Sequence, residues 1–304
     1  MRILLQNKNH IEYMNKNTVV GIWGFGIVGQ AALRFFTQRH YQSIIILESG
    51  TIAPDLYTQY APNTIITVLH DPTQREIFLK KCDVILASAG IDTRLYRSSF
   101  NGIWLNELDI FQALWHKKII AVTGTVGKTT VTHLLSQLLA STTQIATGGN
   151  IGTACFDLLS KQKYCNAAIL EVSSFQLEFV QSFAPDLAIF TTFAENHLDR
   201  HSSMDEYFKA KYGIIAHQRA DQKALLPASC LPYLNQTNHS RSALFLHATT
   251  RQEADGIDAM HAISQSRYHN ADCFTESIAT NHFCTKLAYN FCIITLIEYF
   301  ICTS

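Results

Sequence analysis

TGTVGKTT, residues 123–130, stands directly between the apolar run IIAV (119–122) and the stretch VTHLLSQLLA (131–140). A strand that passes through a glycine-rich turn into a helix is a common phosphate site, because N–H groups of the turn and the helix start attract an anion and a lysine adds a full charge. The strict loop pattern G-x-x-x-x-G-K-[ST] needs glycine where Val122 stands, so only the shorter stretch 124–129 fits. The sequence therefore predicts a phosphate site of a variant kind.

The residues of this turn predict how a nucleotide triphosphate is held. Lys128 is placed for the β- and γ-phosphates, Thr129 offers a hydroxyl to Mg²⁺, and Thr130 extends the helix cap. The alternative is a tight glycine turn with a solvated lysine. Because strand, glycines, lysine, threonine and helix occur in the required order, we favour the phosphate site and take ATP as the ligand. The expected ATP-binding residues are Gly124, Thr125, Val126, Gly127, Lys128, Thr129 and Thr130.

A second glycine-rich turn lies near the start of the chain. Gly24, Gly26 and Gly29 follow an apolar strand pattern and open an amphipathic helix pattern, and Glu48 stands about 20 residues further on. This is the spacing of a dinucleotide site, but many parallel sheets use such glycines only for a tight turn. From these residues alone NAD, another nucleotide and simple packing all stay open.

Strand and helix patterns alternate along the chain. Because β-branched strands alternate with helices, we expect parallel sheets covered on both faces, and hence an α/β fold. It would comprise a Rossmann-like domain over residues 1–114 and a P-loop-type central domain over residues 115–304. Residues 219–280 are polar and weakly patterned, and we place no element there. Further buried strands are expected at SIIILES (43–49), CDVILASAG (82–90), AAILEVSS (167–174) and DLAIFTTF (186–193).

Polar side chains that follow these strands are candidate ligands. Glu171 is an acid after four apolar residues, so it is either paired in the core or holds a metal, and the neighbouring phosphate turn favours the metal. His197 follows the next strand and would reach the same sheet edge, although an ordinary loop is the alternative. Asn150 lies in TGGNIGT, a turn that lets backbone approach a ligand. Lys211, at helical spacing, is by default a solvated lysine.

Composition narrows the class of protein. Basic and acidic residues both number 24, so charge gives no reason to expect nucleic acid or an anionic membrane as partner. The eight cysteines lack zinc-site spacing, which favours reduced thiols in a cytoplasmic protein. The start of the chain lacks the apolar core of a secretory signal. The apolar run 287–304 is a core helix or a membrane anchor, and Glu298 within it favours the core helix.

Taken in order, these stretches resemble the Mur ligase family. TGTVGKTT resembles the family's TGTNGKT/S turn, which accounts for the missing first glycine. GGNIG (148–152) and LEVSSFQLE (170–178) closely match the members that add D-glutamate to UDP-N-acetylmuramoyl-L-alanine. NHLDRH (196–201) and YFKAK (207–211) match the next two landmarks. The resemblance covers roughly residues 18–218.

This resemblance implies ATP-dependent amide-bond formation in peptidoglycan precursor synthesis, with ATP and Mg²⁺ as cofactors. The substrates would be UDP-N-acetylmuramoyl-L-alanine and D-glutamate, and the protein a monomer with no membrane partner. The first glycine turn would hold the UDP group rather than NAD, and Lys211 matches the lysine that the family carbamylates. The implied substrate-binding residues are Ile27, Val28, Ser49, Ser88, Asn150 and His197. The implied catalytic residues are Lys128, His197 and Lys211, and the implied metal ligands are Thr129, Glu171, His197 and Lys211.

Some positions depart from the family pattern. Val126 and Thr192 stand where asparagines are usual, and Thr285 stands at the asparagine that contacts adenine. The chain also ends soon afterwards, so we expect the family's third domain, which carries the D-glutamate site, to be absent. Because a site divided between domains needs both halves, two functions stay open: the ligase, and a non-catalytic remnant that binds a nucleotide or UDP-sugar. An NAD-dependent oxidoreductase is a third hypothesis that rests on the first turn and Glu48 alone.

Overall fold

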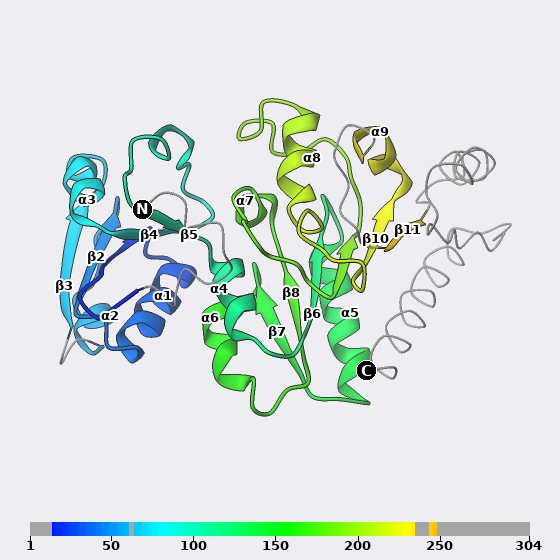
Figure 1. The fold of residues 1–304 in the computed structure, drawn as a ribbon, viewed down its shortest axis with the longest axis horizontal. Coiled ribbons are helices and arrows are strands. Elements are labelled where there is room, and N and C mark those ends of the chain that lie inside the picture. The colour runs from blue at the N-terminus through cyan, green and yellow to red at the C-terminus, as the bar shows by residue number, and fades with distance from the viewer. Residues whose placement is uncertain (1–13, 61–63, 235–242, 248–304) are drawn as a thin grey trace, which may run out of the picture. The chain divides into compact units, whose positions relative to one another are not determined.

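The computed structural model describes residues 14–60, 64–234 and 243–247. These residues form two compact units (Figure 1). One runs up to Lys117 and also includes Ala146–Cys165 and Val172–Phe183. The other comprises Lys118–Ile145, Asn166–Glu171 and the described residues from Ala184 onward. The predictions made for Thr285 and for the apolar run 287–304 lie outside the described residues.

The first unit is built on a five-stranded sheet with the order β3-β2-β1-β4-β5. Neighbouring strands run parallel, and Ile22 of β1 lies opposite Ile46 of β2 and Leu86 of β4. The elements of this unit are β1 (Val19–Trp23), α1 (Ile27–Gln38), β2 (Ser43–Glu48), α2 (Asp55–Thr58), β3 (Ile65–His70), α3 (Arg75–Lys81), β4 (Val84–Ala87), η2 (Arg94–Tyr96), β5 (Ile103–Leu105), α4 (Glu107–Leu114), α6 (Cys155–Leu158), η3 (Leu159–Lys161) and α7 (Ser174–Leu177).

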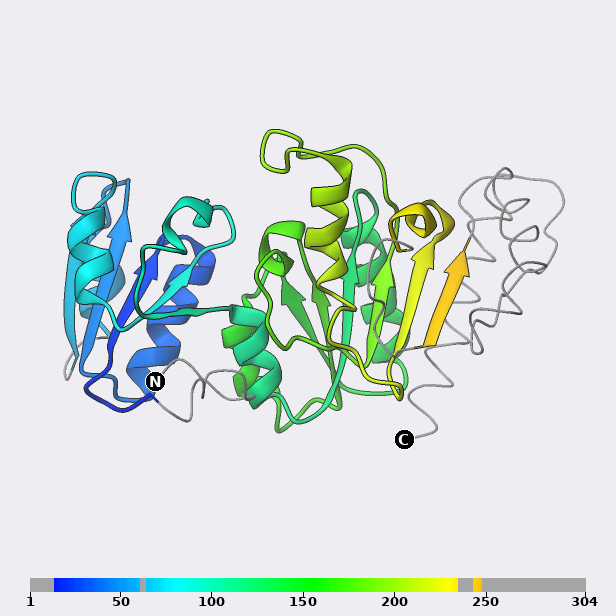
Figure 2. The same ribbon diagram turned by 45° about the horizontal axis from the view of Figure 1, so that its top comes forward.

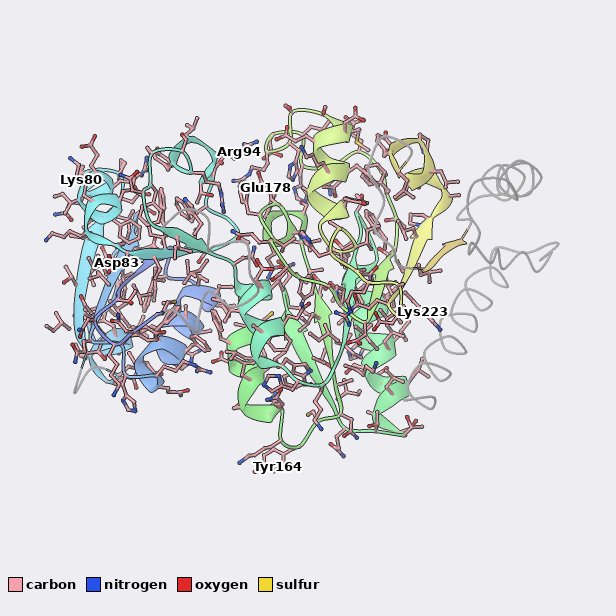
Figure 3. The ribbon with its side chains drawn as sticks, in the orientation of Figure 1. Lys80, Asp83, Arg94, Tyr164, Glu178 and Lys223 are labelled. Carbon is pink, nitrogen blue, oxygen red and sulfur yellow. The ribbon has the colours of Figure 1, made fainter. Side chains whose placement is uncertain are left out.

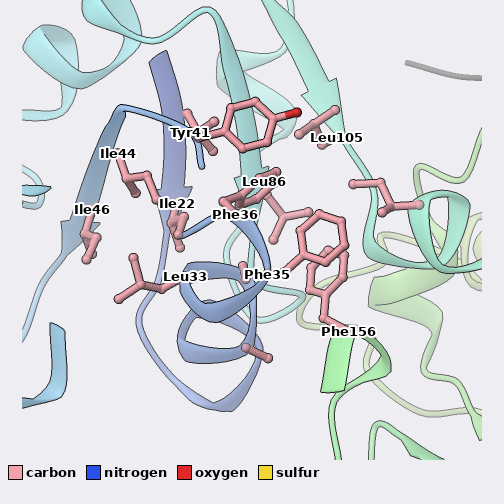
Figure 4. Close-up of a cluster of buried hydrophobic side chains, with 14 of the residues drawn as sticks. Ile22, Leu33, Phe35, Phe36, Tyr41, Ile44, Ile46, Leu86, Leu105 and Phe156 are labelled. Carbon is pink, nitrogen blue, oxygen red and sulfur yellow. The ribbon is translucent and has the colours of Figure 1, made fainter. Parts of the chain in front are cut away.

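In the inner strands of this sheet, β2, β1 and β4, successive side chains are buried on opposite faces. Ile22 and Ile46 pack with Leu33 and Phe36 of α1 in one apolar cluster, shown in Figure 4. A second cluster joins other strand residues to Phe78 of α3. Because side chains in a strand alternate between faces, each face needs its own helix to exclude water. The sheet is thus covered on both faces, and the predicted α/β class is confirmed.

The second sheet has six strands in the order β11-β10-β9-β6-β8-β7, and Figure 2 shows several of them side by side. β6 pairs parallel with both β8 and β9, which places Val122 opposite Glu171 and Thr123 opposite Phe190. The carboxyl ends of these three strands therefore meet at one edge. The elements are β6 (Lys118–Thr123), α5 (Lys128–Ala140), β7 (Ile145–Gly149), β8 (Ala167–Glu171), β9 (Leu187–Phe190), α8 (Met204–Tyr212), β10 (Lys223–Pro227), η4 (Ala228–Cys230), α9 (Leu231–Leu234) and β11 (Ala243–His247).

Helices α5 and α8 supply apolar side chains to the second unit. Leu135 and Leu139 of α5 join Ile120 and Ile169 of the sheet in one buried cluster. Phe208 of α8 stacks on Phe190 of β9 with ring centroids 6.5 Å apart. Ser203 caps α8 by accepting the Glu206 N–H, and two acids occupy its first turn, where the helix dipole favours negative charge. The helix that carries Lys211 is therefore fixed by capping and by its apolar face.

Two segments that are distant in sequence from the first sheet are nevertheless held within the first unit. Glu107, at the start of α4, accepts the Cys155 N–H at 2.9 Å, and Asn106 donates to the Gln176 carbonyl at 3.0 Å. Burial raises the pKa of Glu107 to about 7, although hydrogen bonds from the N–H groups of Cys155 and Phe156 act in the opposite direction. Further bonds and rings add to this packing: Arg94 lies 3.9 Å from Glu178 (Figure 3), and the Phe35 and Phe156 rings stack at 4.4 Å.

Several strands were not predicted from the sequence. β3 is exposed at alternate positions, β5 has three residues, and β10 lies within the stretch where no element was placed. The cysteines that the structure describes, Cys82, Cys155, Cys165 and Cys230, are buried and not disulfide-bonded. Among the described residues, every helix is too short or too polar to cross a membrane.

Candidate functional site

The loop between β6 and α5 can form only with glycine at two positions. Gly124 has φ 145° and Gly127 has φ 88°, both in the region that favours glycine. A Cβ atom on Gly124 would lie 2.0 Å from the Thr191 hydroxyl oxygen, closer than any real contact. Gly127 is the N-cap residue of α5, so the helix begins at Lys128. The first turn of this helix therefore leaves N–H groups that have no partner within the helix, which suits an anionic ligand.

Two lysines converge on this loop. Lys128 donates from Nζ to the Gly124 carbonyl at 3.0 Å, and Lys211 donates to the same oxygen at 2.9 Å. The two nitrogens are therefore less than about 6 Å apart. Lys211 is only 1% exposed, although a lysine at helical spacing is by default solvated.

Burial changes the protonation of both lysines. Burial, together with the positive charge of Lys128 as the smaller cause, lowers the pKa of Lys211 to about 7. Burial also lowers the pKa of Lys128, an effect that Glu171 opposes. A buried ammonium loses solvation, and a neighbouring like charge adds repulsion. Near neutral pH, Lys211 is thus an amine for an appreciable fraction of the time, while Lys128 supplies the positive charge.

Thr129 and Glu171 form a pair of oxygen ligands beside the loop. The Thr129 hydroxyl donates to Glu171 Oε2 at 2.7 Å, and Glu171 is 2% exposed at the end of β8. Mg²⁺ is usually bound by one or two carboxylates together with substrate phosphates, and a hydroxyl is an acceptable further ligand. These donors fit such an ion. No group of three or more His, Cys, Asp or Glu residues that suits a metal occurs in the described part of the chain.

His197 lies in the loop after β9, in the same unit as Lys128. It is exposed, has φ 53°, and accepts the His201 N–H on its carbonyl at 2.9 Å. Its ring lies 6.2 Å from that of Tyr207, and the Tyr207 hydroxyl is 3.4 Å from Thr125 Oγ1. The structure thus connects His197 to the phosphate loop through Tyr207. Thr130, in the first turn of α5, and Val126 are both exposed.

The residues predicted for the UDP group gather at the first glycine turn. Ser88 donates its hydroxyl to the Gly24 carbonyl at 3.1 Å, and Ser49 donates its backbone N–H to Glu48 at 2.8 Å. Ile27 and Val28 begin α1, and Ile27 is 65% exposed.

Glu48 braces the same turn. Its carboxylate accepts the Phe25 N–H at 2.6 Å as well as the N–H groups of Ser49 and Gly50. Burial alone would raise the pKa of Glu48, but these backbone bonds bring it below its usual value. The acid singled out for an NAD ribose therefore holds the chain's own backbone.

Asn150 follows β7 and belongs to the first unit, whereas Lys128 belongs to the second. Its side chain is exposed, and the turn around it is closed by the Gly149 N–H, which donates to the Thr153 carbonyl at 2.8 Å. Gly152 has φ 60° in the same turn. A tight turn at residues 150–152 thus directly follows the buried strand end at Gly148 and Gly149, and a turn here was predicted from the glycines.

Two residues that border the phosphate loop were given no role there by sequence reasoning. Thr191 and Thr192 directly follow β9 and hydrogen-bond to the loop backbone. The available signal was a pair of hydroxyl residues at the end of a strand that neighbours β6. Recognising it required the strand order, which the sequence pattern does not give.

Comparison with known proteins identifies relatives of this chain. Residues 122–293 match the family model for the Mur ligase middle domain. The chain is 33% identical over 221 residues to the UDP-N-acetylmuramoylalanine--D-glutamate ligase of Desulfotalea psychrophila, an alignment that covers 68% of this chain and 46% of that protein. It is 30% identical over 246 residues to the enzyme of the same name from Desulfosudis oleivorans, covering 79% and 53%. The chain thus spans about half the length of these relatives.

A solved structure is also similar. The UDP-N-acetylmuramate:L-alanyl-gamma-D-glutamyl-meso-diaminopimelate ligase from Neisseria meningitides aligns with a TM-score of 0.47 and 13% identity, covering 75% of this chain and 78% of that chain.

Proposed function

The chain belongs to the Mur ligase family, and from that premise we propose that it acts as an ATP-dependent ligase that adds D-glutamate to UDP-N-acetylmuramoyl-L-alanine. The observation that carries this proposal lies within the region matched by the family model. There, the Nζ atoms of Lys128 and Lys211 meet at one carbonyl oxygen, next to the Thr129–Glu171 pair. Positive charge and oxygen ligands beside a helix N-terminus suit a nucleotide triphosphate.

We assign the phosphate-binding role to the loop and to Lys128. In the described structure Lys128 turns back onto the Gly124 and Thr125 carbonyls at 3.0 and 3.1 Å. A bound phosphate would offer its Nζ an anionic acceptor in place of these neutral carbonyls, so that the hydrogen bond would also become an ion pair. Thr129 and Glu171 would hold Mg²⁺, which when bound neutralises phosphate charge. Thr125, Val126, Gly127 and Thr130 complete the proposed ATP site.

The proposed reaction forms an amide at the expense of ATP. The substrate carboxylate attacks the γ-phosphorus, the bond to the bridging oxygen breaks, and ADP leaves. The D-glutamate amine then attacks the acyl carbon, loses a proton and expels phosphate. Negative charge grows on the transferring group, so Lys128 contributes by position and electrostatics rather than by covalent chemistry. His197 is proposed to contact the UDP-sugar substrate or a second Mg²⁺.

We further propose that Lys211 becomes carbamylated. Only a neutral amine attacks CO₂, and burial lowers the pKa of Lys211 to about 7, so the reactive form is available near neutral pH. The Nζ lone pair forms the N–C bond and the nitrogen releases one proton, which leaves a carboxylate. That product is an oxygen ligand for a second cation, so a buried positive charge becomes a metal ligand.

The UDP group is proposed to bind at the turn of the first unit, with residues 1–114 as its domain. Ile27, Val28, Ser49 and Ser88 border this turn, and exposed N–H groups at the start of α1 suit a diphosphate. Asn150 is proposed to contact the same substrate. Since Glu48 is bonded to the turn's own backbone, we favour this ligand over NAD.

Phosphate release tests the proposal directly. The full chain is incubated with UDP-N-acetylmuramoyl-L-alanine, Mg-ATP and D-glutamate, and phosphate is compared with that from a Lys128→Ala variant. Release that depends on all three substrates and falls at least about a hundredfold in the variant is expected, because an oxyanion-stabilising group is worth that much. Glu171→Gln should shift the Mg²⁺ requirement upward. Binding of Mg-ATP without phosphate release above Lys128→Ala would instead show a nucleotide-binding protein that does not ligate.

A further inference from the structure

The Thr192 hydroxyl contacts the backbone of Val126, in the phosphate loop, in two ways. The Val126 N–H donates to Thr192 Oγ1 at 2.9 Å, and the same hydroxyl donates to the Val126 carbonyl at 3.0 Å. The Thr192 backbone adds a third contact, because its carbonyl accepts the Thr125 N–H at 2.8 Å. Thr192 thus binds the loop on both sides of the Val126 side chain, which is itself 68% exposed.

The carbonyls of Gly124, Thr125 and Val126 accept hydrogen bonds from further protein donors. Gly124 and Thr125 accept from lysine Nζ atoms at 2.9 to 3.1 Å, and Val126 accepts from Thr191 Oγ1 at 2.6 Å. Carbonyl oxygens carry partial negative charge, so a loop that turned them outward would repel a phosphate. Since the Thr125 and Val126 N–H groups already donate to Thr192, the N–H groups from Gly127 onward, at the start of α5, are the ones left for a phosphate.

We propose that Thr192 is a positioning residue that fixes the Val126 peptide units and thereby limits the phosphate cradle to the N–H groups from Gly127 onward. The Val126 side chain has no polar atom that could hold its own backbone. The Thr192 hydroxyl supplies that hydrogen bonding instead. The nucleotide part of this inference rests on the proposed ATP site. The loop part stands on geometry alone, and the two parts are tested by different measurements.

Three substitutions separate the hydroxyl from the shape of the side chain. Thr192→Val keeps the volume and branching but removes the hydroxyl, Thr192→Ser keeps the hydroxyl, and Thr142→Val is the matched control. Thr142 lies just beyond the far end of α5 and bonds only within that end, to the Leu139 carbonyl at 3.1 Å. Valine-selective ¹⁵N labelling of the full chain allows hydrogen exchange to be followed at the Val126 amide without nucleotide. Equilibrium binding of Mg-ADP is measured for the same proteins.

Each lost neutral hydrogen bond is worth a factor of about five to ten in an equilibrium constant. Thr192→Val should therefore speed exchange at Val126 by at least about tenfold and weaken Mg-ADP binding about tenfold, while Thr192→Ser and Thr142→Val stay within about threefold of the parent. Equal exchange at Val126 in the parent and Thr192→Val would overturn the positioning role. Faster exchange with unchanged Mg-ADP affinity would overturn its link to the cradle. A parent chain that binds no Mg-ADP would refute the ATP site itself, while the exchange result still decides the loop part.

Discussion

Gly124→Ala is the substitution whose effect is best determined by the structure. The added Cβ would lie 2.0 Å from Thr191 Oγ1 and 3.0 Å from the Thr192 backbone nitrogen, whereas ordinary contact begins at 3.4 Å. The backbone of the new alanine would also have to adopt φ 145°. Overpacking costs about 1–3 kcal/mol, and a strained backbone costs about 1–3 kcal/mol, so we expect a loss of about 2–6 kcal/mol in the free energy of unfolding.

Two comparison variants separate the steric and the backbone contributions to this loss in the free energy of unfolding. Gly127→Ala meets its nearest atom, on Thr191, at 3.8 Å but still requires φ 88°, so it should cost only the strain, about 1–2 kcal/mol. Thr191→Ala removes the atom in closest contact. In the double variant Gly124→Ala/Thr191→Ala we therefore expect the two effects to be non-additive, with about 1–2 kcal/mol recovered relative to their sum.

Urea unfolding followed by far-UV circular dichroism measures these free energies. All three tryptophans, Trp23, Trp104 and Trp115, belong to the first unit, so tryptophan emission in the same titration reports on that unit separately. The emission transition should stay unchanged. A Gly124→Ala loss no larger than that of Gly127→Ala, or strict additivity with Thr191→Ala, would refute the reasoning from the Thr191 contact.

Two further predictions concern pH. Burial lowers the folded-state pKa of Lys211 to about 7 from 10.5, so the unfolded chain binds more protons between these two pH values. The free energy of unfolding should therefore rise with pH across that interval by up to about 1.4 kcal/mol per pH unit. Lys211→Met should remove this slope when unfolding is followed by circular dichroism, and an unchanged slope would show that another group titrates. Because burial raises the pKa of Glu107 to about 7 from 4.5, the folded chain binds the extra proton, and stability of the first unit should fall as pH rises from 4.5 to 7. Glu107→Gln should flatten this dependence in tryptophan emission, whereas a parent chain that gains stability over the same interval would contradict it.

The short-range features of the fold were open to prediction from sequence. TGTVGKTT and the first glycine turn each contain a strand end, glycines and a helix start within a few residues, so local sterics and capping decide them. The buried strands β1, β2, β4, β6, β8 and β9 were predicted because both faces are covered, which makes their sequences continuously apolar. β3 and β5 were not predicted because an exposed edge strand and a three-residue strand lack this continuous apolar pattern.

The contacts within the site depended on strand order. Thr129 and Glu171 are 42 residues apart, and Lys211 is 87 residues from Gly124. They meet because β6 lies between β8 and β9, so their carboxyl ends share one edge. Periodicity gave no information on this order, and it likewise gave no sign that Thr192 would bind Val126.

What the sequence by itself determined is the identity and local shape of the chemical groups: a glycine turn, a lysine at a helix start, and an acid at a strand end. Only the tertiary structure decided their protonation and partners. A lysine at helical spacing is solvated unless packing removes the water, and Lys211 is buried because its Nζ lies over the rings of Phe190, from β9, and Tyr207, from its own helix α8.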